Sequence, residues 1–253
     1  MVGGGGTVRK GVVDLPRWVD GILAVTYDCW GTLLQDRDWE GAMERRVGAL
    51  QRFLDLSDDD ARALIDEAWN HHDEAWKQVE SFGPGRMAAY CLEEHDISDD
   101  DSINTLTREF EEASIDAGVE AVAGAKATLD ALSAKNIRLA LICDTGFTPG
   151  RVVRTLLDDA GLLDHFEALC FSDEVGVPKP GQEIFAKALA ELGVQPYETV
   201  HVGDLKRTDV AGARNVGIHP IRFRGVHDDE CDSTEAECVI DRHEEILDVL
   251  GLT

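Results

Sequence analysis

The chain has 253 residues and a formal net charge of −26, from 50 acidic and 24 basic residues. So negative a protein repels the phosphate backbone, which excludes nucleic acid as a partner. No apolar stretch approaches the ~20 residues needed to cross a bilayer, so a membrane partner is not expected either. The length suits either one core or a core domain with a smaller second domain.

Residues 1–20 begin with a run of glycines and hold no apolar segment of the secretory type, which predicts a partly disordered N-terminal extension. The six cysteines are scattered without a Cys-x-x-Cys pair, which favours reduced thiols over disulfides or a zinc site. These features predict a cytoplasmic protein. The acidic excess also favours adaptation to high salt, where screening relieves self-repulsion.

The first predicted strand covers residues 22–27 and runs into Asp28-Cys29-Trp30-Gly31-Thr32. A buried parallel strand that ends in an acid places a carboxylate at the carboxyl edge of a sheet, where open α/β sheets bind ligands. Such a carboxylate can act as a nucleophile. Asp also closes ordinary strand-to-loop turns, so this segment alone leaves both interpretations open.

Residues 36–118 show apolar residues at intervals of three and four and no convincing strand. Two Asp-Asp-Asp runs in this block are predicted to be helix starts and solvated faces. Trp69, His72 and Trp76 fall on one stripe of a helix. His71 does not share the face of His72, because adjacent helical residues point about 100° apart. Such a stripe is more typical of packing within the block than of a site.

From residue 119 onward helical and strand patterns alternate, with strands predicted over 137–143, 168–171, 199–202, 218–223 and 238–240. This alternation predicts a parallel sheet with helices on both faces. The fold class is therefore α/β, a Rossmann-like parallel sheet core with an inserted all-helical cap domain. The core is assigned to residues 21–35 and 119–253, and the cap to residues 36–118.

Two further segments at the same sheet edge suit an anionic substrate. Cys143-Asp144-Thr145 ends the second strand and offers a thiol, a hydroxyl and turn amides for phosphate oxygens, although an ordinary turn has the same residue types. Lys179 lies between Pro178 and Pro180, which restrict the backbone and hold a cation able to stabilise negative charge.

A second group of acids follows the strand over 199–202, as Gly203-Asp204 and then Asp209. Together with Asp28 they would form an all-oxygen site suited to Mg²⁺. Asp209 alone would also suit the N-cap of a helix.

In order and placement these four segments resemble the motifs of the haloacid dehalogenase superfamily, in the subfamily with a helical cap inserted after the first motif. The resemblance extends from residue 22 to the C-terminus. It implies that Asp28 is the nucleophile, Lys179 the conserved cation, and Asp204 and Asp209 the metal-binding acids. The backbone carbonyl of Trp30 would be a further metal ligand.

The second motif departs from the family pattern, which ends its strand in Ser or Thr followed by Asn. Here Cys143-Asp144 occupies that place and Thr145 follows one or two positions late. The resemblance therefore implies that one of Cys143, Asp144 and Thr145 contacts the substrate phosphate, without selecting among them.

Trp30 stands where the phosphatases of this family carry an Asp that acts as general acid and base. Such help is worth ~10²–10⁴-fold in rate, and an indole cannot provide it. An aromatic residue here resembles the metal-independent 2-haloacid dehalogenases, which lack the Gly-Asp pair present as Gly203-Asp204.

We therefore predict a Mg²⁺-dependent phosphatase that acts on a small phosphomonoester through an aspartyl-phosphate. The alternatives are a metal-independent 2-haloacid dehalogenase and a non-catalytic binding protein on a degenerate site. A dehalogenase would need a cation near the cap hinge for the substrate carboxylate. Arg37, Arg45 and Arg46 are the candidates, and we expect ordinary solvated arginines there.

Overall fold

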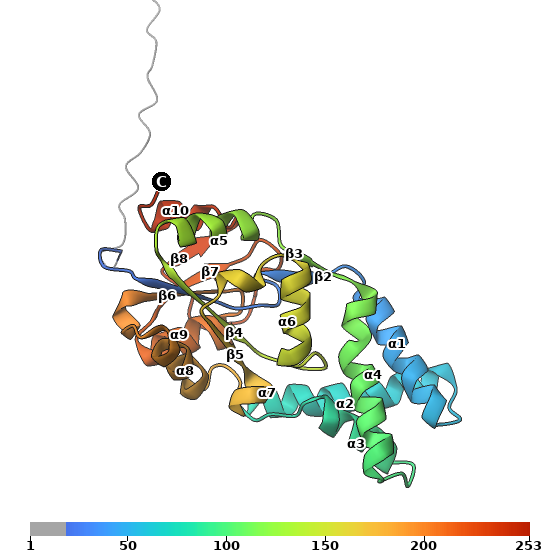
Figure 1. The fold of residues 1–253 in the computed structure, drawn as a ribbon. Helices are drawn as coiled ribbons and strands as arrows, with labels where there is room; N and C mark the ends of the chain where they lie inside the picture. The colour runs from blue at the N-terminus through green and yellow to red at the C-terminus, as the bar shows by residue number, and fades with distance from the viewer. Residues whose placement is uncertain (1–18) are drawn as a thin grey trace, which may run out of the picture.

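The computed structural model describes residues 19–253 and has a parallel sheet at its centre (Figure 1). The strand order is β5-β4-β1-β6-β7-β8. The strands are β1 (Ala24–Tyr27), β4 (Arg138–Cys143), β5 (Ala168–Phe171), β6 (Thr199–Gly203), β7 (His219–Phe223) and β8 (Cys238–Ile240). This confirms the predicted α/β class. The extension predicted over residues 1–20 lies, up to residue 18, outside the described residues.

Helices cover both faces of the sheet, because alternate residues of each strand point to opposite sides. Val25 and Tyr27 face an apolar cluster shared with helices α5, α6 and α10, whereas Ala24 faces a cluster shared with α8 and α9. The helical elements of this part are α5 (Ala125–Ala134), α6 (Gly150–Asp159), α7 (Ser172–Val175), α8 (Gln182–Leu192), α9 (Ala211–Val216) and α10 (Glu245–Val249), with 3₁₀ turns at Leu163–His165 and Pro196–Glu198 and a π-helical turn at Lys206–Val210.

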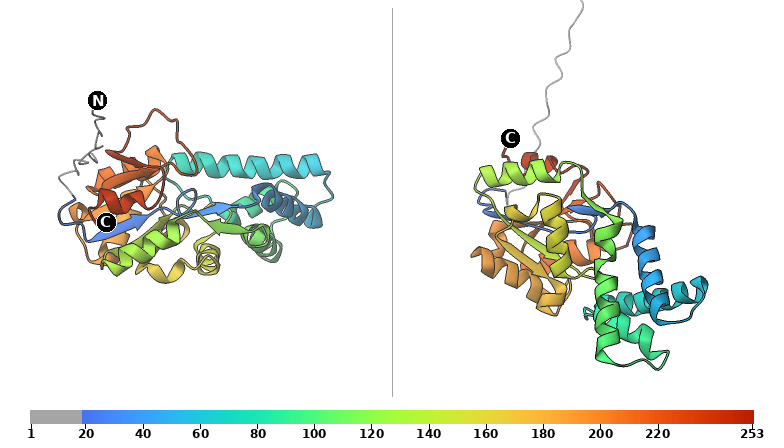
Figure 2. Two further views of the ribbon diagram at one scale, coloured as in Figure 1. Left: turned by 90° about the horizontal axis from the view of Figure 1, so that it is seen from above. Right: turned by 45° about the vertical axis from the view of Figure 1, so that its right-hand side comes forward.

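The four-helix unit, residues 39–117, lies to one side of the sheet (Figure 2). Its helices pack around an apolar cluster of their own. They are α1 (Trp39–Phe53), α2 (Asp58–Lys77), α3 (Pro84–Glu93) and α4 (Asp100–Ala117). The two Asp-Asp-Asp runs lie at the starts of α2 and α4, as predicted: the first follows the N-cap Ser57, and the second supplies the N-cap Asp99 and the first two helical residues. That this unit is a separate cap domain stays a prediction.

Two short strands, β2 (Leu34–Asp36) and β3 (Val119–Ala121), pair antiparallel where the chain enters and leaves the four-helix unit. The sequence analysis missed both, because three residues are too few to show an alternating pattern. The pair holds the two connections side by side, so a narrow ribbon joins the unit to the sheet.

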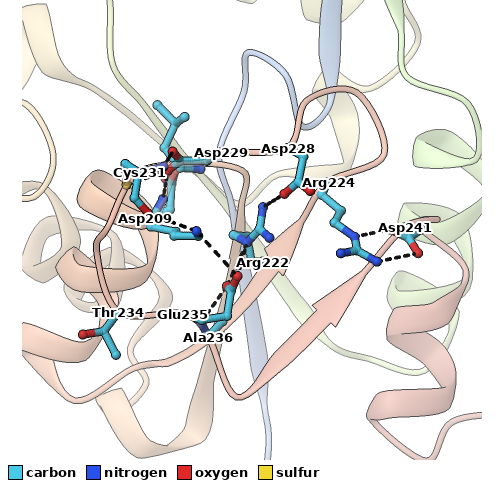
Figure 3. A network of polar contacts seen from close by, with 12 residues as sticks. Asp209, Arg222, Arg224, Asp228, Asp229, Cys231, Thr234, Glu235, Ala236 and Asp241 are labelled. Atoms are coloured by element: carbon cyan, nitrogen blue, oxygen red, sulfur yellow. Dashed lines mark hydrogen bonds and ion pairs between the residues drawn. The ribbon is translucent and has the colours of Figure 1, made fainter.

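The loop between β7 and β8 is fastened to the sheet by charged side chains (Figure 3). Arg222 is 3% exposed, and its guanidinium donates to Asp228 and Glu235, each at 2.8 Å. The Lys206 backbone N–H donates to Asp229 of the same loop at 2.7 Å. The loop is therefore tied to the turn that follows β6.

All six cysteines are free, and four of them are buried. This agrees with the expectation of reduced thiols. Within residues 19–253, each helix is too short or too polar to cross a bilayer.

Candidate active site

Asp28 directly follows the central strand β1, at the carboxyl edge of the sheet. Because β1 lies between β4 and β6, the residues that follow those strands, Asp144 and Asp204, emerge at the same edge. The Asp28 backbone N–H donates to the Val202 carbonyl at 2.8 Å, and the Thr32 hydroxyl donates to Asp28 Oδ2 at 3.2 Å. The carboxylate is thus held in place and only 6% of the residue is exposed.

Lys179 joins two of the predicted acids. Its Nζ lies 2.5 Å from Asp28 Oδ1 and 2.7 Å from Asp209 Oδ1, and the residue is 2% exposed. Burial alone would lower the pKa of Lys179, but the carboxylates of Asp209 and Asp28 outweigh it and hold this pKa well above its usual value. The lysine is therefore a fixed cation beside Asp28.

Asp209 is fixed from several sides. His201 Nε2 lies 3.1 Å from its Oδ1, and the Leu205 backbone N–H donates to its Oδ2 at 3.0 Å. Burial would raise the pKa of Asp209, but Lys179 and His201 hold it well below its usual value. Asp209 is thus a carboxylate whose oxygens are already engaged within the protein.

Asp28, Asp204 and Asp209 each offer a carboxylate oxygen, and these three atoms lie within 4.8 Å of one another. Two glycines permit this approach. A Cβ atom at Gly31, where φ is +73°, would lie 2.6 Å from Asp204 Oδ2, and one at Gly203 would lie 2.3 Å from Asp209 Cγ. Side chains at these two positions would collide with the acids, so both glycines are required by the site.

When ionised, the three acids would carry more negative charge than one lysine can neutralise, and their pKa values shift accordingly. Burial raises the pKa of Asp28 to about 7, although Lys179 opposes this. Burial, together with the charges of Asp28 and Asp209, raises the pKa of Asp204 to about 9. A buried, all-oxygen, acid-rich donor set of this kind fits a hard divalent cation such as Mg²⁺.

Of the three residues of the second motif, one lies in the core and two lie at the site. Cys143 is fully buried in the apolar cluster of the sheet and does not line the site cavity. Asp144 accepts the Lys179 backbone N–H on Oδ1 and the Trp76 indole N–H on Oδ2, each at 2.8 Å. The Thr145 hydroxyl lies 2.9 Å from the Ser172 hydroxyl. Asp144 and Thr145 line the cavity.

A cavity of about 400 Å³ lies between the sheet edge and the four-helix unit. Asp28, Asp204 and Asp209 line one side of it, with Trp30 and Gly31 beside them. The four-helix unit supplies Trp39, Arg46, Trp69, His72, Asp73, Trp76 and Ser114, and the loop after β4 supplies residues 144–148. The indole N–H of Trp30 can donate a hydrogen bond but is far too weak an acid to protonate a leaving group.

Arg46 corrects the expectation of solvated arginines near the hinge. Arg37 and Arg45 are exposed as expected, but Arg46 is fully buried and lines the cavity. Its guanidinium donates to the Phe110 carbonyl at 3.1 Å and lies 4.4 Å from the Phe147 ring centroid. Burial lowers the pKa of Arg46 to about 10, so it remains a cation.

The stripe of Trp69, His72 and Trp76 also differs from its interpretation. All three residues lie on α2, and all three line the cavity, so the stripe is not packing alone. Trp69 does pack within the unit's apolar cluster as well. The available signal was that four of the chain's five tryptophans lie between residues 30 and 76 of the sequence, and all four line this cavity.

Comparisons with known proteins agree on the fold. A family model described as "Hydrolase: haloacid dehalogenase-like hydrolase" matches residues 22–217. A solved HAD phosphatase from Thermococcus onnurineus superposes with a TM-score of 0.65 over 91% of this chain and 98% of its own, at 24% identity.

Two curated proteins match shorter segments. The "Haloacid dehalogenase-like hydrolase domain-containing protein 3" of Bos taurus is 34% identical over 102 residues, which is 40% of this chain and 39% of that protein. The "Glyceraldehyde 3-phosphate phosphatase" of Methanopyrus kandleri is 38% identical over 94 residues, which is 36% of this chain and 40% of that protein. The matches thus span about two fifths of the relatives' length.

Proposed function

The chain belongs to the haloacid dehalogenase-like hydrolases, and from this premise we propose that it is a Mg²⁺-dependent phosphatase for a small phosphomonoester. One observation carries the proposal: the buried acids Asp28, Asp204 and Asp209 face the single ammonium of Lys179. A metal-free reaction on an anionic substrate would gain nothing from this surplus of negative charge, whereas a divalent cation offsets it. The phosphatase named among the relatives supports the same class of reaction.

The residues present fit the metal. Asp28, Asp204 and the Trp30 backbone carbonyl would hold Mg²⁺. Asp209 would support them from behind, since its oxygens already accept from Lys179 and from the Leu205 N–H. When bound, Mg²⁺ offsets negative charge on the phosphoryl oxygens and orients the phosphate.

The reaction begins with attack of the Asp28 carboxylate on phosphorus. The ester P–O bond breaks, and the leaving group departs with its electron pair, which leaves an aspartyl-phosphate. Lys179 holds the attacking carboxylate and stabilises the charge that develops beside it. Water then releases phosphate and regenerates Asp28. Trp30 gives no proton to the leaving group, so good leaving groups are favoured.

The four-helix unit would act as the cap that selects the substrate. It contributes roughly one wall of the cavity and is joined to the core by the β2–β3 ribbon. The division proposed is a core of residues 21–35 and 119–253 and a cap of residues 36–118. Closure of such a cap would exclude water from the phosphoryl group during transfer.

A 2-haloacid dehalogenase is the second candidate, because two observations favour it. Trp30 lacks an acid, which a halide leaving group does not need, and the buried cation Arg46 lines the cavity, where a substrate carboxylate would lie. The surplus carboxylates Asp204 and Asp209 count against this candidate.

The test is release of phosphate from p-nitrophenyl phosphate in molar KCl, with Mg²⁺ and with EDTA, beside release of chloride from 2-chloropropionate. We expect phosphate release that requires Mg²⁺ and disappears in Asp28→Asn, while circular dichroism shows the fold unchanged. Chloride release that resists EDTA would replace the phosphatase by the dehalogenase. If the folded protein released neither phosphate nor chloride, a binding protein would be favoured.

A further inference from the structure

The cavity is rich in aromatic side chains. Trp39, Trp69 and Trp76 line it together with Phe147, and Trp30 lies beside Asp28, whereas aromatic residues make up only 6% of the chain. A phosphate alone would not need a cavity of about 400 Å³, so most of this space is available to the leaving group.

The rings are packed as a rigid platform. Trp69 stacks on Phe147 with ring centroids 5.2 Å apart and planes 14° apart, and Trp39 meets Trp69 edge-on at 6.1 Å. Phe147 comes from the loop after β4, whereas Trp39 and Trp69 come from the four-helix unit. The indole N–H of Trp76 is fixed by Asp144. The rings therefore form one platform that joins the four-helix unit to the loop after β4, and protein contacts hold it in place without a ligand.

The hydroxyl side chains of the lining are already engaged within the protein. The three hydroxyls that line the cavity have partners in the protein, since Ser114 and Thr148 lie 2.9 Å apart and Thr145 pairs with Ser172. Both Asp144 oxygens accept N–H groups. These groups therefore offer few free partners to the hydroxyls of a sugar or glycerol leaving group.

A quaternary ammonium group is also disfavoured, although aromatic rings commonly bind such cations. The guanidinium of Arg46 lies 4.4 Å from the Phe147 centroid, and that of Arg207 lies 3.9 Å from the Trp76 centroid. Two of the rings are thus already paired with cations, so those ring contacts are not free for a quaternary ammonium group. A planar neutral ring can stack on indole and guanidinium faces alike.

We propose that this cavity binds a planar aromatic leaving group by stacking, so that the substrates are aryl phosphomonoesters. The inference rests on the proposed phosphatase function and narrows its substrate class. It also accounts for Trp30: phenols ionise near pH ~10, far below water at ~15.7, so an aryl oxide can depart without a proton donor. In the step, the aryl P–O bond breaks, the aryl oxide keeps the electron pair, and solvent protonates it.

The first experiment separates stacking from leaving-group reactivity. Benzyl phosphate and cyclohexylmethyl phosphate both release an alkoxide of similar size, but only the first is planar. With Mg²⁺ present, we expect kcat/KM for benzyl phosphate to exceed that for cyclohexylmethyl phosphate by about tenfold, with phenyl phosphate faster than both. Equal values for the first pair would overturn the inference and leave the phosphatase function standing.

A binding measurement tests the cavity without turnover. By titration calorimetry with Mg²⁺, the wild-type protein should bind phenylphosphonate about tenfold more tightly than cyclohexylphosphonate. If no ester is hydrolysed but this preference is seen, the proposed function fails and the aromatic site stands. If both phosphonates bind equally, the aromatic site fails.

Variants assign the preference to the platform. Trp69→Leu should abolish the preference for phenylphosphonate, and Trp69→Phe, which keeps a ring, should retain it. Trp39 is 47% exposed, so Trp39→Leu tests the same wall with little cost to folding, and it should reduce the preference. Tyr197→Leu, at an exposed aromatic residue outside the cavity lining, is the matched control. A preference unchanged in both Trp69→Leu and Trp39→Leu would overturn the proposal.

Discussion

The indole N–H of Trp76 donates to Asp144 at 2.8 Å, across the boundary between the four-helix unit and the sheet edge. The other oxygen of Asp144 accepts the backbone N–H of Lys179, the residue whose ammonium holds Asp28. One carboxylate thus links the helix that carries the aromatic stripe to the segment that carries the site's cation. The position of the four-helix unit and the position of Lys179 therefore depend on the same carboxylate.

Asp144→Asn should weaken this link. Both Asp144 oxygens accept N–H groups, so an amide must turn its NH₂ toward one donor, either Trp76 or Lys179. We expect a loss of about 1–3 kcal/mol in the free energy of unfolding, measured by urea denaturation. Trp76→Phe removes only one donor and should cost less. If the two losses simply add in the double variant, the link is not the cause.

Lys179→Met should be more damaging, because it leaves buried carboxylates without their cation. Removing one partner of a buried ion pair costs about 3–5 kcal/mol, and Lys179 contacts both Asp28 and Asp209. Urea denaturation in EDTA measures this loss. Lys187→Met, at an exposed pair with Glu191, is the matched control and should cost under about 1 kcal/mol. Similar losses in the two variants would contradict the buried-cation account.

Most strands of the sheet could be predicted from the sequence, because parallel strands covered on both faces are continuous apolar runs. Each run here ends at a polar residue that the topology brings to one edge, as with Asp28 after β1 and Asp204 after β6. Neighbouring parallel strands end at the same edge whatever their separation in sequence. The clustering of acids was therefore predictable before any coordinates.

The cavity wall was not predictable in the same way. Periodicity places Trp69 and Trp76 on one stripe of a helix, but the surface that this stripe faces depends on how the unit docks. Arg46 shows the same limit, since charge alone suggests a solvated residue and only packing against Phe110 and Phe147 reveals its burial. Cys143 points into the core because it still belongs to β4, where alternate residues share a face, and it lies on the face of Leu139 and Leu141.

Asp204→Asn should separate the protein's own stability from its stabilisation by metal. The variant removes one of three acids whose oxygens lie within 4.8 Å of one another, and with it the free-energy cost of burying that carboxyl beside the other two in the metal-free protein. In EDTA at pH 8, we expect a melting temperature at or above that of the wild type. Millimolar Mg²⁺ should raise the melting temperature of the wild type but not of the variant. An equal Mg²⁺ shift in both proteins would remove Asp204 from the proposed ligands.

His243 provides a test of pH dependence away from the acids. It is 1% exposed, its Nε2 lies 2.8 Å from the Thr32 carbonyl, and its ring stacks on Phe223. Burial lowers the pKa of His243 below its usual value of 6.5. The unfolded chain therefore binds this proton more readily than the folded one. The stability that the neutral ring contributes is present above pH ~6.5 and is lost as pH falls toward the folded-state value.

His243→Gln keeps a group able to donate to the Thr32 carbonyl but removes the titration. Between pH 8 and pH 5, we expect the free energy of unfolding of the variant to fall less steeply than that of the wild type, by up to about 1.4 kcal/mol per pH unit below pH ~6.5. Urea denaturation at half-unit intervals of pH measures the two slopes. His95→Gln, at an exposed histidine, should follow the wild type. Parallel curves for His243→Gln and wild type would mean that this buried ring does not govern the acid sensitivity.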